Sequence, residues 1–227
     1  MKSVVILCDG AADRPIPELN GQTAFEAAHH PHLDEMARHG IFGLARTVPE
    51  GMPPGSDTAN LSVFGYDPKV YYTGRSPLEA ASIGIPLELC DVTYRCNLVM
   101  LSHHPADPDA RMADYSAGEI TTAEAAQLIE ALQPIIRDYV GAELHTGVSY
   151  RHCLVLRDAE TGADLTPPHD ISNRSIVPYL PKGTHAELLL EMMGRSYDLL
   201  RDHPVNLDRM ARGLNPANCM WLWGEGR

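Results

Sequence analysis

Residues 92–100 read VTYRCNLVM, with apolar side chains at every second position. This period of two places successive side chains on opposite faces of a strand, so the run predicts a half-buried strand with Arg95 on its second face. Residues 121–136 and 184–199 each begin with Thr-x-x-Glu and continue with an apolar helical face, which is typical of capped helices. Residues 150–157 alternate as a further strand. The middle of the chain is therefore predicted to be a compact α+β unit.

The N-terminal part has a different texture. Residues 4–8 form a continuous apolar run that ends in Asp9 and Gly10, which is the pattern of a buried parallel strand whose carboxyl end opens into a loop. Residues 41–48 predict a second strand, and Pro31 divides the helical segment between the two. From these features we expect an α/β fold, in which ligands gather at the strand ends.

A last strand is predicted at residues 218–223, which are strongly apolar. Few residues follow it, although a buried parallel strand normally leads into a loop and a covering helix. We therefore expect this chain to be part of a longer protein. The two tryptophans, Trp221 and Trp223, are expected in the core, and a core cut open at this point would expose an apolar edge that favours self-association.

The composition excludes several classes of function. The 227 residues include 18 Lys and Arg against 30 Asp and Glu, a formal net charge of −12, which argues against nucleic-acid binding. The N-terminal apolar run is too short for a signal peptide or a membrane span, and the five cysteines are scattered without a CxxC pair. We therefore expect a cytoplasmic protein with reduced thiols and no membrane partner. The sequence also lacks the motifs of P-loop, dinucleotide, zincin and α/β-hydrolase sites.

Two residues are candidates for metal binding and catalysis. Asp9 is a carboxylate at the end of a predicted strand, where it would either ligate a hard cation or cap a turn. Ser56 lies between Gly55 and Asp57 at the start of a predicted helix. There it would act as a nucleophile favoured by the helix dipole, or as an ordinary N-cap residue. The residue types alone leave these alternatives open.

Arginines stand out in a chain with few cations, because the planar guanidinium group binds phosphate or carboxylate through two hydrogen bonds at once. The candidates are Arg75, Arg95, Arg151 and Arg227, each of which would otherwise be a surface residue. His169 and Asp170 form a loop pair that would transfer protons, bind an anion or stabilise a turn.

Several short segments, taken together, resemble a known family. They are CDG and DRP within residues 8–15, PGSDTAN at 54–60, GYDP at 65–68 and YTGR at 72–75. In this order and spacing they are similar to the cofactor-independent phosphoglycerate mutases of the archaeal type, within the alkaline phosphatase superfamily. The similarity continues to residues 216–218 and so covers nearly the whole chain.

This resemblance implies a metal-dependent phosphoryl transfer. It would interconvert 3-phosphoglycerate and 2-phosphoglycerate through a phosphoserine, in glycolysis and gluconeogenesis, without 2,3-bisphosphoglycerate as a cofactor. By the same resemblance, Asp9 matches a metal ligand, and Ser56 matches the nucleophile that also contacts the metal. The divalent metal would be Mn²⁺ or Mg²⁺, which suit oxygen ligands, with Zn²⁺ as the alternative.

The resemblance also implies a partial alkaline-phosphatase-like core, a parallel-rich sheet with flanking helices, that carries an inserted α+β domain. The predicted domains are 1–85 for the first part of the core, 86–212 for the inserted substrate-binding domain and 213–227 for a return strand of the core. The residues of the inserted domain that would hold the glycerate or its phosphate are Arg95, Arg151, His169 and Asp170.

Members of this family are much longer and carry their remaining metal ligands in their second half. We therefore expect the present chain alone to be inactive or nearly so and to bind metal weakly. Two alternatives stay open. One is a phosphohydrolase or phosphotransferase of the same superfamily that acts on another small hydroxy acid, and the other is a non-catalytic module that binds a phosphorylated metabolite or a partner chain.

Overall fold

The computed structural model describes residues 2–8, 10–52 and 54–227, which form two compact units. The first unit is Met1–Arg46 and the second is Thr47–Arg227. The predicted domain boundaries near residues 86 and 213 both fall inside the second unit and stay predictions. Among the described residues, no helix is long and apolar enough to cross a bilayer.

The first unit contains short helices. They are η1 (Pro17–Leu19), α1 (Ala24–Ala27) and α2 (Pro31–His39). Pro31 is the first residue of α2, where its missing N–H and fixed φ suit a helix start, so the predicted division of the helical segment at this residue is confirmed.

The two strands predicted in the first unit are wrong. Residues 4–8 and 41–47 belong to no helix or strand, and their apolar side chains face solvent: Val4 is 83% exposed and Ile41 is 102% exposed. A strand is stable only where a neighbouring strand satisfies its backbone N–H and C=O groups. Within the described part of this unit no other strand lies beside these segments, so their apolar pattern alone does not make them strands.

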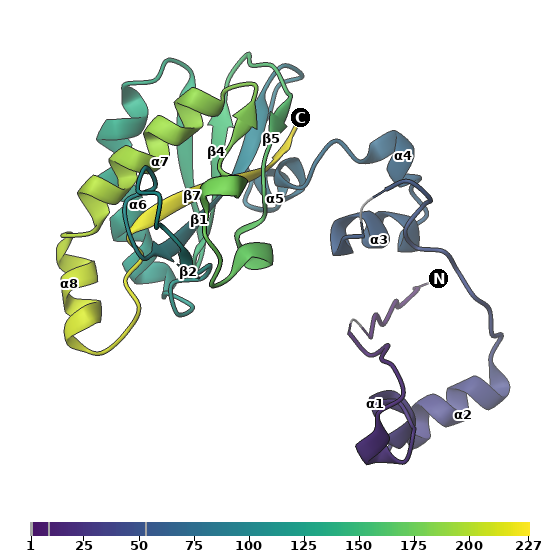
Figure 1. Cartoon of the computed structure of the whole chain (residues 1–227). Helices are drawn as coiled ribbons and strands as arrows, with labels where there is room; N and C mark the ends of the chain where they lie inside the picture. Colours follow the sequence, from purple (N-terminus) through teal and green to yellow (C-terminus); the bar gives the residue numbers. More distant parts are fainter. Residues whose placement is uncertain (1, 9, 53) are drawn as a thin grey trace. The chain divides into compact units, whose positions relative to one another are not determined.

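The second unit is built on an antiparallel sheet. Its strands are β1 (Val92–Leu101), β2 (Met112–Asp114), β3 (Ala142–Val148), β4 (Arg151–Leu156) and β7 (Cys219–Gly226). Their order is β2-β1-β4-β3, and β7 pairs with the other side of β1, beside which it runs in Figure 1. A separate two-stranded ribbon joins β5 (Ala163–Asp164) and β6 (Lys182–Gly183).

Every strand pairing among the described residues is antiparallel, so the parallel orientation predicted for the last strand is wrong. The continuous apolar run in β7 has another cause. Its residues Cys219–Trp223 are buried on both faces, and a fully buried strand shows the same continuous pattern whichever way its neighbour runs.

The helices of the second unit are α3 (Ser56–Val63), α4 (Pro68–Tyr71), α5 (Ser76–Ser82), α6 (Thr122–Arg137), α7 (Ala186–Leu200) and α8 (Pro204–Ala211), with turns η2 (Pro168–Ile171) and η3 (Val177–Tyr179). The capping box predicted at Thr121 and Glu124 is confirmed at the start of α6. The one predicted at Thr184 is wrong, because the Thr184 N–H donates to the Gly162 carbonyl beside the β5–β6 ribbon and α7 begins only at Ala186.

Strand β1 is buried along both faces, which corrects the prediction of a half-buried strand. Tyr94, Cys96 and Leu98 pack into the main core with α6 and α7. The second face is covered by α5, where the buried hydroxyls of Ser76 and Thr93 share a hydrogen bond of 2.7 Å. Because a helix also covers this face, Arg95 is enclosed rather than exposed to solvent.

The two tryptophans of β7 lie in the core, as predicted. Trp221 is 1% exposed and Trp223 is 4% exposed. The exposed apolar edge predicted around them is therefore wrong, because β1 and the helices cover these side chains. Self-association itself stays a prediction.

Candidate functional site

Ser56 is the first residue of α3 and its side chain is exposed. The N-cap of this helix is Gly55, which is in an extended conformation and has no side chain that could cap the first turn. The reading of Ser56 as an ordinary N-cap is therefore wrong. The hydroxyl lies at the positive end of a helix dipole, where an anion or a developing alkoxide is stabilised.

Tyr72 is joined to the first turn of α3 through Asp57. The Tyr72 hydroxyl donates to Asp57 Oδ2 at 2.7 Å, while the Thr58 backbone N–H donates to Asp57 Oδ1 at 2.9 Å. Burial and the hydrogen bond to Asp57 raise the pKa of Tyr72, so its hydroxyl stays protonated and remains a donor. The Asp57 carboxylate folds back so closely that a Cβ on Gly55 would overlap Asp57 Oδ1. A side chain at position 55 would therefore require the Asp57 carboxylate to move.

A cavity of about 310 Å³ joins the start of α3 to α5. Ser56, Asp57 and Asn60 line it from α3, and Arg75 and Glu79 line it from the other side. This volume is at the lower end of the range that small-molecule sites occupy. The structure therefore brings the predicted nucleophile and one predicted arginine to the same cavity.

Arg75 and Arg95 meet at Glu79 and Trp223. Glu79 Oε1 lies 2.9 Å from Arg95 Nη1 and 3.5 Å from Arg75 Nε. The guanidinium carbons of Arg95 and Arg75 lie 4.6 Å and 5.5 Å from the centre of the Trp223 ring, within the range of cation–π attraction. We call Arg75, Glu79, Arg95 and Trp223 the arginine cluster.

Arg95 is the most enclosed member of the arginine cluster, with 4% of its side chain exposed. Burial lowers the pKa of Arg95 to about 10, although the Glu79 carboxylate opposes the shift. The group remains charged at neutral pH. Its Nε is buried and has no hydrogen-bond partner among the described residues. A buried guanidinium with an unused donor has capacity to bind a further acceptor.

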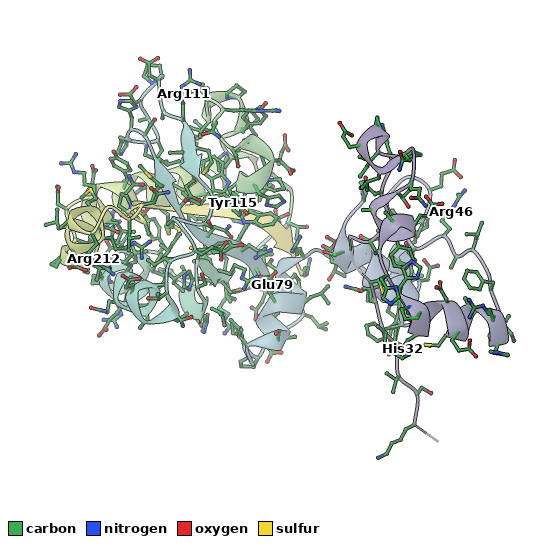
Figure 2. The ribbon with its side chains drawn as sticks, turned by 90° about the horizontal axis from the view of Figure 1, so that it is seen from below. His32, Arg46, Glu79, Arg111, Tyr115 and Arg212 are labelled. Atoms are coloured by element: carbon green, nitrogen blue, oxygen red, sulfur yellow. The ribbon has the colours of Figure 1, made fainter. Side chains whose placement is uncertain are left out.

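A series of aromatic contacts links the arginine cluster to His169 and Arg151, which were also predicted as binding residues. His169 packs edge-on against Trp223 at 5.4 Å between ring centroids and against Tyr115 at 6.1 Å. Tyr115 in turn contacts Tyr150, over which Arg151 lies at 5.3 Å. Tyr115 is labelled in Figure 2 within the same unit as Glu79.

The His169 imidazole is protonated to a smaller extent than that of an exposed histidine. Burial lowers the pKa of His169, and the positive charges of Arg75 and Arg95 lower it further, against the effect of Asp170. The Asp170 carboxylate lies 3.6 Å from His169 Nε2 and is itself largely exposed. His169 therefore faces the arginines mainly as an uncharged imidazole near pH 7.

One predicted residue, Arg227, is not brought into this arrangement. Arg227 Nε donates to the Leu89 carbonyl at 2.7 Å, and its Nη2 lies 3.6 Å from Cys90 Sγ. Asp9 lies outside the described residues. Among the residues that are described, no group of three or more His, Cys, Asp or Glu side chains could hold a metal ion.

The roles of Glu79, Trp223, Asp57 and Tyr72 were not predicted from the sequence. The spacing of Arg75 and Glu79, four residues apart, is a usable signal, because residues at this spacing meet on one face if the segment is helical. Trp223 was predicted only as a core residue. Its contact with Arg95 depends on the register of β1 and β7, which pairs these two positions and which the sequence does not reveal.

A serine at a helix start, a small cavity and an arginine cluster beside it form a site whose chemistry suits a small anionic ligand. The profile of the 2,3-bisphosphoglycerate-independent phosphoglycerate mutases matches residues 37–206. The chain belongs to this family.

Relatives agree over the full length of the chain. It is 53% identical to the "Probable 2,3-bisphosphoglycerate-independent phosphoglycerate mutase" of Geobacter sulfurreducens and 50% identical to the 2,3-bisphosphoglycerate-independent phosphoglycerate mutase of Methanothrix thermoacetophila. In each case all of this chain is covered, with 56% and 55% of the relative. The chain thus spans little more than half the length of these relatives.

Two solved structures are similar in fold to nearly the whole of this chain. The cofactor-independent phosphoglycerate mutase of Thermoplasma acidophilum is 28% identical, with a TM-score of 0.56, over 96% of this chain and 57% of that one. A protein of Pyrococcus horikoshii is 29% identical, with a TM-score of 0.65, over 96% of this chain and 49% of that one.

Proposed function

We propose that the complete protein interconverts 3-phosphoglycerate and 2-phosphoglycerate, with Ser56 as the nucleophile, and that it works in glycolysis and gluconeogenesis. Family membership supports this proposal. The observation that carries it is the cavity lined by both Ser56 and Arg75, with the arginine cluster at its border.

In the proposed reaction, Ser56 Oγ attacks the phosphorus of 3-phosphoglycerate. The bond between phosphorus and the C3 oxygen of the glycerate breaks, and a bond between phosphorus and Ser56 Oγ forms. The proton of the serine hydroxyl passes to solvent, while the leaving oxygen gains a proton. The 2-hydroxyl of the glycerate then attacks the phosphorus of the phosphoserine and loses its proton to solvent, while the bond to Ser56 Oγ breaks and the serine oxygen regains a proton. Backbone N–H groups at the start of α3 and the Arg75 guanidinium favour the phosphate at this position.

Arg95, Arg151, His169 and Asp170 are proposed to hold the glycerate or its phosphate. Their linkage through Trp223, Tyr115 and Tyr150 supports a common role. Arg227 was proposed for the same role, but its contacts to Leu89 and Cys90 give this assignment less support than those of the others.

A divalent metal, Mn²⁺ or Mg²⁺ with Zn²⁺ as the alternative, is proposed for the complete protein, with Asp9 and Ser56 among its ligands. The described residues do not by themselves form a ligand set for such an ion, since no suitable group of three side chains occurs among them. The remaining ligands and the parallel-rich phosphatase-like core, with a domain inserted at about 86–212, are proposed for the complete protein.

The test uses the complete protein with added Mn²⁺ or Mg²⁺ and ³¹P NMR, which separates 3-phosphoglycerate, 2-phosphoglycerate and inorganic phosphate. We expect 2-phosphoglycerate to form and Ser56→Ala to abolish its formation. Ser62→Ala is the matched control, because Ser62 lies on the same helix and its hydroxyl donates to the Thr58 carbonyl. Release of inorganic phosphate without 2-phosphoglycerate would instead indicate a phosphohydrolase.

A further inference from the structure

The Glu79 carboxylate lies between Arg75 and Arg95, in the position that a ligand anion would take. A single carboxylate oxygen, Oε1, lies 2.9 Å from Arg95 Nη1 and 3.5 Å from Arg75 Nε. Carboxylate and phosphate oxygens bind guanidinium groups at the same distances and with the same geometry. The position between the two arginines is therefore filled by a group of the chain itself.

Glu79 does not use all the donors of the arginines. Its carboxylate contacts Arg95 and Arg75, and Arg95 also lies within range of the positive charge of Arg151. Arg95 is almost fully buried, and its Nε lacks a partner among the described residues. This unused buried donor favours an anion that offers more acceptor oxygens than one carboxylate.

Glu79 is the member of this group that can move. Its side chain is 34% exposed, against 4% for Arg95. Arg95 is held on one side by the Trp223 ring, whose centre lies 4.6 Å from the guanidinium carbon. Figure 2 shows Glu79 on α5 at the border of the sheet. It lines the cavity with Ser56 and also a second cavity of about 260 Å³ with Arg151, so space exists on both sides.

We propose that Glu79 is an internal counter-ion that occupies Arg75 and Arg95 in the unliganded chain and is displaced by an anionic group of the ligand. This inference rests on the proposed function, in which these arginines bind the substrate anion. Displacement makes Glu79 a determinant of anion affinity. A monoanion such as acetate competes poorly with an attached carboxylate, whereas an anion with two or more charges gains from both arginines and from the unpartnered Nε of Arg95.

The test is calorimetric titration of the 227-residue chain with inorganic phosphate, 3-phosphoglycerate and acetate. We expect Glu79→Gln to lower the Kd for phosphate and 3-phosphoglycerate about tenfold, which is the scale of removing one like charge at close range in a partly solvated site. Acetate should gain as well, by no larger a factor than phosphate, because each anion displaces the same carboxylate. Glu187→Gln, an exposed position at the start of α7, removes the same charge elsewhere and should leave every Kd unchanged.

Weaker anion binding by Glu79→Gln would overturn the proposal and make Glu79 a group that orients Arg95. Absence of any phosphate binding by both chains would overturn it too. If Glu79→Gln fails to fold, as judged by circular dichroism, Glu79→Asp provides the test, since its shorter carboxylate is expected to hold the arginines less firmly and to raise anion affinity in part. Tighter phosphate binding together with no mutase activity of the complete protein would uphold the role of Glu79 and refute the proposed function.

Discussion

Replacing Arg95 with methionine separates the stability of the second unit from its capacity to bind an anion. Arg95 carries a buried charge, an ion pair of 2.9 Å to Glu79 and a cation–π contact with Trp223. Methionine has a similar length and a flexible apolar side chain that fills the same space. Glu79 keeps Arg75 as a partner and is partly exposed, so the substitution leaves no isolated buried charge.

The effects on stability nearly cancel. Loss of the cation–π contact costs about 1–2 kcal/mol, and loss of the ion pair, in which Arg95 is buried and Glu79 is partly exposed, costs about 1 kcal/mol more. Against this, a buried guanidinium carries a desolvation penalty of several kcal/mol that methionine does not. We therefore expect the free energy of unfolding of Arg95→Met to lie within about 1 kcal/mol of the parent value or above it. Anion binding, by contrast, loses a charge-assisted hydrogen bond worth about 1.5–3 kcal/mol, which corresponds to a Kd roughly 10- to 150-fold higher.

Both quantities are measured on the 227-residue chain, by urea denaturation and by calorimetric titration with inorganic phosphate. Arg174→Met is the control, because Arg174 is exposed and far along the chain from the arginine cluster, and it should change neither quantity. A loss of more than about 3 kcal/mol in Arg95→Met would show that the buried ion pair stabilises the fold and would refute the reasoning. Unchanged phosphate affinity would refute the assignment of Arg95 to the anion site.

Three further predictions concern Tyr72, His152 and Mn²⁺ binding. Tyr72→Phe removes the hydrogen bond to Asp57 and should lower the kcat of the complete protein about tenfold with KM unchanged, whereas Tyr71→Phe, at an exposed neighbour, should have no effect in the same steady-state assay. Burial lowers the pKa of His152 to about 4 from an ordinary value of 6.5, so the unfolded chain binds a proton at a higher pH than the folded chain does. The free energy of unfolding should therefore fall as the pH drops from about 6.5 towards 4. Urea denaturation at pH 7 and pH 4.5 should show a smaller difference for His152→Gln than for the parent chain. The 227-residue chain should bind Mn²⁺ more weakly than the complete protein, and equal affinity in calorimetry would contradict the expectation that further ligands come from outside it.

Local patterns predicted the parts of the fold whose stabilising contacts are close in sequence. The strand at 92–100 and the capping box at Thr121 are confirmed, because alternation and capping depend on residues within one strand or one turn. The strands expected at 4–8 and 41–48 failed for the opposite reason. Their formation depends on a partner strand, and an apolar run does not say whether one is present.

The candidate site, too, was predicted only where the signal is local in the sequence. Ser56 and Arg75 were predicted from short motifs, and both line the cavity. The role of Trp223 depends on a strand register that joins residues 128 positions apart, Arg95 and Trp223, and neither position indicates this pairing alone. The burial of Arg95 likewise depends on α5 crossing the second face of β1, a tertiary feature without a local signature.

Residues 72–75 explain how the nucleophile and the arginine cluster are held in one unit. Tyr72 binds the Asp57 carboxylate beside Ser56, and Arg75 lines the cavity and contacts Trp223. Between them Gly74, at a φ of +130°, approaches the end of β7 so closely that a Cβ would overlap the Glu225 carbonyl. Only glycine allows this approach, and it fixes the start of α5 against the strand that carries Trp223. The four residues therefore connect the helix that presents Ser56 to the strand that orients the arginines, so a change in the backbone at Gly74 would act on anion binding and on the position of the serine together.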